Sequence, residues 1–299
     1  MKTTLTSNWR PLLRAFYPFL IVIAALWAMP RTARAQLYVT QGGTGGFVSK
    51  YNATTGALIK AHFITRLNGP IGLAVSGTDL FVAIETANKV GKYNATTGAA
   101  INANFITGLH APSFGLVLNT SARRLFVTNT ISVTNTVGEY NATTGAPINA
   151  SLITGLFETE GLAYMGPTPL SSVPFLFVAN FGTNTVGKYN AKTGTVINAS
   201  FITVPSPTGL ALLGNTLFVG SFASYTVGAY DATTGAPINA SLITGLNRPV
   251  GLALLGNNLF VVNQATNNGT VGEYNATTGA AINANFITGL ITPVALAVK

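Results

Sequence analysis

The sequence contains no cysteine, which excludes disulfide bonds and thiolate metal sites from the fold. Charged residues are also scarce, at 8% of the 299 residues, and only 7 residues are acidic. The 2 histidines are too few for a histidine-bound zinc centre. Stability must therefore come from buried apolar surface, which a hydrophobic content of 48% can supply.

A basic stripe of the kind that binds a phosphate backbone is missing too. Basic residues outnumber acidic ones by 16 to 7, but they are scattered along the chain. Five of the basic residues and none of the acidic ones fall within residues 1–35, so the remainder carries a charge of only +4. We therefore predict no nucleic-acid partner.

The first residues have the order of an export signal. Basic residues precede an apolar run from Ala15 to Ala28, and the small residues Ala33 and Ala35 follow. A retained membrane anchor is the alternative, but the run of about 14 residues is shorter than the ~20 that span a bilayer. We predict that residues 1–35 are a signal peptide cleaved after Ala35. The mature protein is then secreted or periplasmic and has no membrane span.

A single unit dominates the rest of the sequence. The segment Val-Gly-Lys-Tyr-Asn-Ala-Thr-Thr-Gly-Ala, which begins at Val90, recurs with small changes. Its tyrosine is found at Tyr51, Tyr93, Tyr140, Tyr189, Tyr230 and Tyr274. The spacings of 42, 47, 49, 41 and 44 residues match a four-stranded propeller blade and exceed the roughly 33–34 residues of the shorter helical repeats.

Each unit has four segments rich in β-branched or aromatic residues, which we name strands A to D. Strand B is apolar almost throughout, as in Leu217-Phe-Val, which indicates a sheet covered on both faces. Asn-Ala-Thr-Thr-Gly connects C to D. There the Asn side chain can bond the backbone ahead, and Gly accepts a positive φ. Asp231 replaces this Asn once.

The two ends of the chain predict ring closure. The mature part opens on a B strand at Leu37 and ends on an A strand at Val294, so one blade is shared between the termini. The A strands are expected to begin near Ile71, Phe114, Gly161, Thr208, Val250 and Val294. The B strands are expected near Leu37, Leu80, Leu125, Leu176, Leu217 and Leu259. We predict an all-β, six-bladed β-propeller over residues 36–299, acting as a monomer.

The unit resembles a known repeat. Pro249-Val-Gly-Leu-Ala, Leu259-Phe-Val-Val-Asn and Thr270-Val-Gly-Glu-Tyr together look like the NHL repeat, and the likeness covers residues 37–299. The chain is also similar to the YVTN-type repeats of secreted bacterial propellers. Its Asn-Ala-Thr-Thr-Gly turn resembles that of PQQ-type repeats, but their tryptophan is missing. These resemblances imply a six-bladed, secreted propeller.

Unrepeated loop residues are the candidates for function, because propellers place the D–A and B–C loops on one face. His110, Glu158 and Glu160 replace neutral residues of neighbouring units, and Glu85 follows a B strand. They could converge as metal ligands or as an acid–base pair, or they could be solvated loop residues, which we favour. Arg66 and Arg248, from two further D–A loops, complete the candidate ligand contacts.

One variable position is interpreted as part of a solvated face and not as a binding site. The residue before each marker tyrosine changes sign freely, which predicts a solvated face. These residues are Lys50, Lys92, Glu139, Lys188, Ala229 and Glu273.

No nucleophile elbow, phosphate-binding loop or Cys/His metal spacing occurs, so we predict no catalytic residue, resident metal or cofactor. The favoured function is a non-catalytic binding module for a protein or carbohydrate. The alternative is a metal-dependent hydrolase resembling the gluconolactonase-type lactonases. Its site would use Glu85, Glu158, Glu160 and Asn180, none of which matches that family's pattern.

Overall fold

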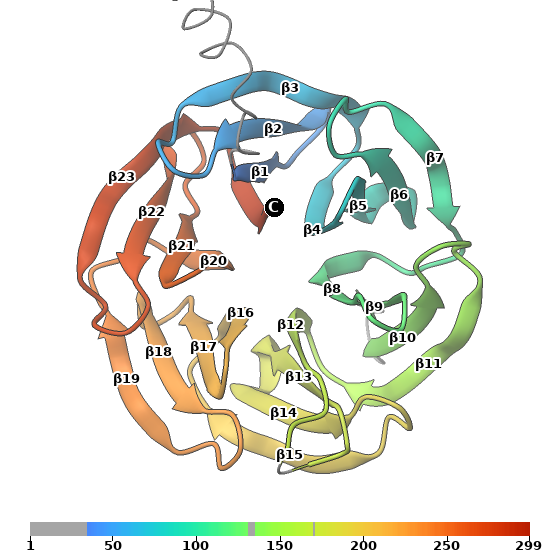
Figure 1. Ribbon diagram of the computed structural model, residues 1–299, viewed down its shortest axis with the longest axis vertical. Helices are drawn as coiled ribbons and strands as arrows, with labels where there is room; N and C mark the ends of the chain where they lie inside the picture. The colour runs from blue at the N-terminus through green and yellow to red at the C-terminus, as the bar shows by residue number, and fades with distance from the viewer. Residues whose placement is uncertain (1–34, 131–134, 170) are drawn as a thin grey trace, which may run out of the picture. The chain divides into compact units, whose positions relative to one another are not determined.

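The computed structural model describes residues 35–130, 135–169 and 171–299, so the predicted signal peptide up to Arg34 lies outside the described residues. Ala35–Lys299 is one compact unit. It consists of six four-stranded antiparallel sheets arranged around a central axis, as Figure 1 shows. The prediction of a six-bladed β-propeller is confirmed. No helix within the described ranges is long and apolar enough to cross a membrane.

The strands follow the predicted A to D order from the axis outwards. The A strands are β4 (Pro70–Ser76), β8 (Pro112–Asn119), β12 (Thr159–Met165), β16 (Pro207–Leu213), β20 (Pro249–Leu255) and β24 (Pro293–Val298). The B strands are β1 (Gln36–Gln41), β5 (Asp79–Ile84), β9 (Arg124–Asn129), β13 (Phe175–Asn180), β17 (Thr216–Ser221) and β21 (Asn258–Asn263). Each begins within two residues of its predicted start.

The outer strands complete each blade. The C strands are β2 (Gly46–Asn52), β6 (Lys89–Asn94), β10 (Asn135–Asn141), β14 (Thr185–Asn190), β18 (Thr226–Asp231) and β22 (Gly269–Asn275). The D strands are β3 (Leu58–Leu67), β7 (Ala100–Ile106), β11 (Pro147–Leu156), β15 (Val196–Thr203), β19 (Pro237–Ile243) and β23 (Ala281–Leu290). Two single-turn 3₁₀ helices, η1 (Glu85–Ala87) and η2 (Phe181–Thr183), follow β5 and β13.

Blade I is built from both ends of the described unit, as predicted. β1 pairs with β2 on one side and with β24 on the other, with Leu37 opposite Val298. Gln36 and Lys299 exchange two backbone hydrogen bonds of 2.8 Å each. This pairing closes the ring without leaving an exposed inner edge. We number the blades in chain order, from blade II (β4–β7) to blade VI (β20–β23).

The C–D turns form as the sequence predicts. In blade II, Oδ1 of Asn94 accepts hydrogen bonds from the amides of Thr96 at 2.8 Å and Thr97 at 2.9 Å. Gly98 then adopts a φ of 79°. The carboxylate of Asp231 accepts the two corresponding amide bonds in blade V. Each blade therefore reverses direction through the same side-chain contact.

The core lies between blades rather than at the centre of the ring. Leu217, Phe218 and Val219 of strand β17 are no more than 1% exposed. Phe218 belongs to an apolar cluster with Leu259 and Tyr274 of the next blade, and similar clusters occupy the other seams. Burial of both faces of strand B explains its apolar composition.

The interpretation of the residue before each marker tyrosine as a solvated face is wrong. Lys50, Lys92, Glu139, Lys188 and Glu273 are all buried, with exposures between 2% and 8%. Each lies on strand C and points into the seam between blades. A buried charge is costly unless it is paired or hydrogen-bonded, so each must have specific partners.

The three lysines find these partners in the C–D turn of the following blade. Nζ of Lys188 donates to the carbonyl oxygens of Ala232 at 2.9 Å and Thr233 at 3.1 Å. It also lies 4.4 Å from the ring centre of Phe175 and 4.7 Å from that of Phe201. Burial lowers the pKa of Lys188. The cation thus stabilises the junction between blades IV and V.

The two glutamates at this position find their partners within their own blades. Glu139 forms an ion pair with Arg124 of the adjacent strand β9. Glu273 accepts a 2.6 Å hydrogen bond from Nδ2 of Asn258 on β21. A carboxylate cannot bond the turn carbonyls of the next blade, because both groups are acceptors. The charge of this residue therefore determines whether its side chain bonds to the next blade or only to the neighbouring strand of its own blade.

Candidate functional site

The candidate site lies on the face that carries the D–A and B–C loops, which we call the mouth face. Since each sheet is antiparallel, these loops share one end of the blade and the A–B and C–D loops share the other. At the mouth face, the residue before each A strand has a φ between 38° and 66°. These left-handed corners are Gly69, Ala111, Glu158, Ser206, Arg248 and Thr292.

A repeated hydrogen bond holds every corner in place. The carbonyl oxygen of the corner residue accepts from the first amide after strand B, at 2.9 to 3.2 Å. In blade IV, for example, the amide of Phe181 donates to Glu158 at 2.9 Å. The backbone therefore fixes two side-chain positions per blade at the mouth face, whatever residues occupy them. Sequence divergence at these positions changes the surface without changing the scaffold.

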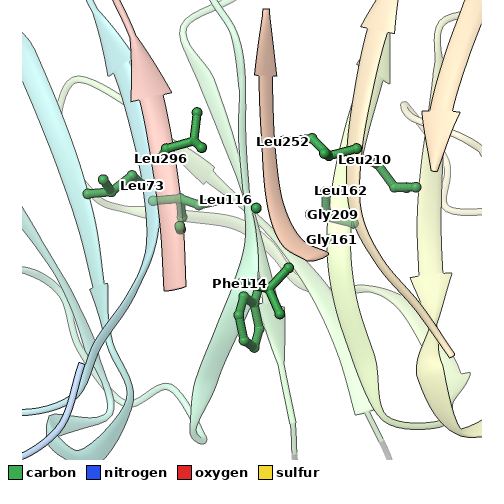
Figure 2. A pocket seen from close by; sticks show the side chains of 12 residues that line it. Leu73, Phe114, Leu116, Gly161, Leu162, Gly209, Leu210, Leu252 and Leu296 are labelled. Carbon is green, nitrogen blue, oxygen red and sulfur yellow. The ribbon is translucent and has the colours of Figure 1, made fainter. Parts of the chain in front are cut away.

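The central channel is closed beneath the mouth face. Six leucines, one from each inner strand, line a cavity of about 60 Å³, and Figure 2 shows them around the axis. This volume holds only a few water molecules. The leucines are Leu73, Leu116, Leu162, Leu210, Leu252 and Leu296. A larger ligand therefore has no room within this cavity.

The residue preceding each channel leucine brings the inner strands together. It is glycine in five blades and Ala295 in the sixth. A Cβ atom at Gly209 would lie 2.5 Å from the carbonyl oxygen of Val250 on β20. Neighbouring A strands approach closely here because no side chain separates them. The narrow channel is a consequence of this contact.

Glu160 is the one acidic residue in a ring of neutral positions at the mouth end of the inner strands. Its Oε2 accepts a 3.3 Å hydrogen bond from Oγ of Ser113 in blade III. Strand β8 has one more residue than β4 between the first proline and the channel leucine of the strand, and Ser113 lies in this longer segment. Bulges of this kind often redirect a side chain next to a functional site. Glu160 and the longer segment that contains Ser113 both depart from the repeat, and they meet at the seam between blades III and IV.

The surroundings of Glu160 favour its protonated form. Burial raises the pKa of Glu160 to about 8, the hydrogen bond from Ser113 lowers it, and the charges of Glu158 and Glu85 raise it further. The negative charges of Glu158 and Glu85 thus act on Glu160 from the same face of the protein. These residues are three of only 7 acidic residues in the chain.

We predict that Glu160 makes the protein less stable as the pH rises. Its folded pKa of about 8 exceeds the ordinary 4.5, so the folded chain keeps a proton that the unfolded chain loses. The free energy of unfolding should fall between about pH 5 and 8 and then level off. Glu160→Gln should remove this fall and exceed wild type by roughly 2 to 4 kcal/mol at pH 9.

Urea denaturation at pH 5, 7 and 9 measures this effect. Glu158→Gln is the matched control, and it should alter the pH profile only slightly, because burial contributes more than the neighbouring charges. Coincident profiles for wild type and Glu160→Gln would show that the carboxyl group is well solvated.

The other predicted residues are dispersed. Glu158, His110, Arg66 and Arg248 are exposed side chains on four different D–A connections. Across the described ranges, no hydrogen bond or ion pair joins His110 to Glu158 or Glu160. The part of the chain that the structure describes contains no group of three His, Cys, Asp or Glu side chains that could hold a metal ion. The convergence of histidine and glutamates on one site stays a prediction.

The structure adds aromatic residues that the sequence hypothesis did not include. The ring centres of Phe181 and Phe222 lie 6.0 Å apart in an edge-on arrangement. Cζ of Arg248 lies 5.6 Å from the centre of Phe222, and Phe157 is 47% exposed nearby. Phe181 and Phe222 occupy the first position after strand B, where the other blades carry Gly42, Glu85, Thr130 and Gln264.

Comparison with known proteins supports the fold. No protein family matches this sequence, and no curated protein matches it. A chain in the crystal structure of the nidogen/laminin complex is similar, with a TM-score of 0.68 and 15% identity over 88% of this chain and 98% of that one. The computationally designed Ika8 protein is similar with a TM-score of 0.50 and 13% identity, over 88% and 87% of the two chains. At such identities the likeness shows the β-propeller fold alone, and membership of the NHL or YVTN group stays a prediction.

Proposed function

We propose that this protein is an exported, non-catalytic interaction module that binds a protein or carbohydrate through its mouth face. The observation that carries the proposal is the contrast between scaffold and surface. Hydrogen bonds, turns and channel leucines repeat in all six blades, whereas the left-handed corners carry Gly, Ala, Glu, Ser, Arg and Thr. Variable side chains on a fixed scaffold are typical of recognition surfaces.

Two further points support a binding role. The channel leaves a cavity of only about 60 Å³, so a small substrate has little room to be enclosed. The nidogen/laminin structure places a chain of this fold in a protein complex, which supports the proposal by architecture only. The export signal, and with it a secreted or periplasmic location, is inferred from residues 1–35.

A binding screen tests this proposal. Purified protein is applied to arrays of glycans and of extracellular proteins, and we expect saturable binding to at least one member. Ser206→Arg, at a mouth-face corner, should abolish that binding because it introduces a long charged side chain into the surface. Ala122→Arg, in an A–B loop of the opposite face, is the matched control and should bind normally. Equal loss in both variants would contradict the proposed face.

A metal-dependent hydrolase or lactonase is the second candidate, because the charges of Glu158 and Glu85 raise the pKa of Glu160 at the mouth face. A thermal-shift titration with Ca²⁺, Mg²⁺, Mn²⁺ and Zn²⁺ distinguishes it. A specific metal site would raise the unfolding midpoint in proportion to the logarithm of the metal concentration. Such a rise, together with no binding to any member of the glycan and protein arrays, would favour the hydrolase over the interaction module.

A further inference from the structure

Three phenylalanines lie near one another on the mouth face over blades IV and V. Phe157 packs directly against the backbone of Gly182, where a Cβ atom would collide with its ring. Gly182 follows Phe181, whose ring meets Phe222 at 6.0 Å and 69°. We call Phe157, Phe181 and Phe222 the aromatic run. It joins residues from two blades into one apolar strip.

The fold does not require these phenylalanines. The position of Phe181 and Phe222 is held by Gly42, Glu85, Thr130 and Gln264 in the other blades, with the same backbone hydrogen bond. Phe157 keeps 47% of its surface exposed, and the other two rings are half-buried. Phe222 also packs against a core cluster, but each of the three rings retains exposed surface that a partner can bury.

Charges of opposite sign lie at the two ends of the aromatic run. At one end, the guanidinium of Arg248 lies over the ring of Phe222. At the other, the carboxylate of Glu158 approaches Gly182 beside Phe157. The two ion pairs found in the described part of the chain are Lys92 with Asp79 and Arg124 with Glu139, so neither end charge is neutralised by an ion pair there.

This arrangement specifies a complementary ligand. A guanidinium supported by an aromatic ring is well suited to bind a carboxylate through two parallel hydrogen bonds. Exposed aromatic residues with an arginine are also the residue types that contribute most to protein–protein binding. Between the two charges the three phenylalanines offer no hydrogen bond, which suits apolar side chains better than the hydroxyl groups of a carbohydrate.

We propose that the aromatic run binds a short exposed segment of a partner protein, in which apolar side chains lie between an acidic and a basic residue. The acidic residue pairs with Arg248, the apolar side chains pack on Phe222 and Phe181, and the basic residue lies towards Glu158. This inference rests on the proposed binding role of the mouth face and specifies the class of partner.

The experiment pans a phage-displayed library of random 12-residue peptides on the full-length protein after its normal processing, with a glycan array in parallel. We expect enriched peptides to carry Asp or Glu within a few residues of large apolar side chains. Arg248→Glu and Phe222→Ala should each weaken the best peptide by about tenfold or more. Arg123→Glu is the matched control, because Arg123 is also exposed and left-handed but lies on the opposite face.

A charge exchange gives the sharpest readout. Changing the acidic residue of the peptide to lysine should restore binding to Arg248→Glu while weakening binding to wild type.

Circular dichroism and the melting temperature confirm that each variant is folded, and the exposed position of Arg248 keeps the test valid if Phe222→Ala unfolds. Enriched peptides without an acidic residue, or equal losses in Arg248→Glu and Arg123→Glu, would overturn the inference. Glycan binding without peptide enrichment would overturn the inference but leave the proposed function standing. If neither peptides nor glycans bind, both the inference and the proposed function would be overturned.

Discussion

Replacing Lys188 with glutamate should destabilise the protein by about 4 kcal/mol or more, the largest effect that we expect from a single change of charge. The side chain is 5% exposed, and its ammonium donates to two carbonyl oxygens of the next blade. A carboxylate in this place would face two acceptors and the negative faces of several phenyl rings. It could not regain its lost hydration, so the junction between blades IV and V should open.

Two further variants separate the charge from the packing. Lys188→Met keeps an apolar stem among the phenyl rings but leaves the carbonyls of Ala232 and Thr233 without their donor, and should cost about 1 to 3 kcal/mol. Lys192→Glu makes the same charge change at an exposed turn residue and should stay within about 0.5 kcal/mol of wild type. Chemical denaturation supplies the measurement. Similar losses for Lys188→Glu and Lys192→Glu would mean that the Lys188 ammonium remains hydrated.

A single methyl group at Gly209 should cost about 3 kcal/mol. The new Cβ would lie 2.5 Å from the carbonyl oxygen of Val250 and 3.0 Å from the amide nitrogen of Leu252. Both atoms belong to the backbone of the neighbouring inner strand, so no side-chain rotation relieves the contact. The strands β16 and β20 must separate, which opens the narrowest part of the ring.

Gly166→Ala is the matched control. Its Cβ would meet nothing closer than Cε1 of Tyr164 at 3.8 Å, and Gly166 does not have a left-handed φ. We expect a change of less than about 1 kcal/mol, because ordinary contact replaces open space and the unfolded chain loses some freedom. Thermal and urea unfolding measure both variants. A Gly209→Ala protein as stable as Gly166→Ala would show that the inner strands can move apart at little cost.

The fold could be predicted from the sequence because its determinants are local and repeated six times. The tyrosine spacing gave the blade length, the Asn-Ala-Thr-Thr-Gly turn gave the hairpin, and the segments at Leu37 and Val294 gave the split blade. Each of these features acts within one unit or between strands that pair directly. Repetition makes such signals visible even without related sequences.

The burial of Lys188 could not be predicted in this way, because its partners belong to another blade. A lysine that alternates with glutamate suggests a solvated position when each unit is considered alone. Only the packing of one strand C against the following C–D turn shows that a cation finds carbonyl groups there. The same limit applies to Glu160, whose hydrogen bond depends on one additional residue in the preceding blade.

The candidate site stays a prediction. The sequence named Glu85, Glu158 and Glu160 as candidates at the mouth face, and the charges of Glu158 and Glu85 raise the pKa of Glu160. It did not identify Phe181 and Phe222, because phenylalanine next to a strand is more readily interpreted as core. Their exposure results from the backbone geometry at the corners, which the residue types themselves do not reveal.

The left-handed corners also bear on how such a protein can change over time. Six different residues occupy the same conformation, each held by a main-chain hydrogen bond that is indifferent to the side chain. A mutation at a corner therefore alters what the surface presents while the stability of the ring is largely preserved. Copies of one blade can in this way diverge in specificity independently, so a duplicated structural unit becomes a set of separately adjustable recognition positions.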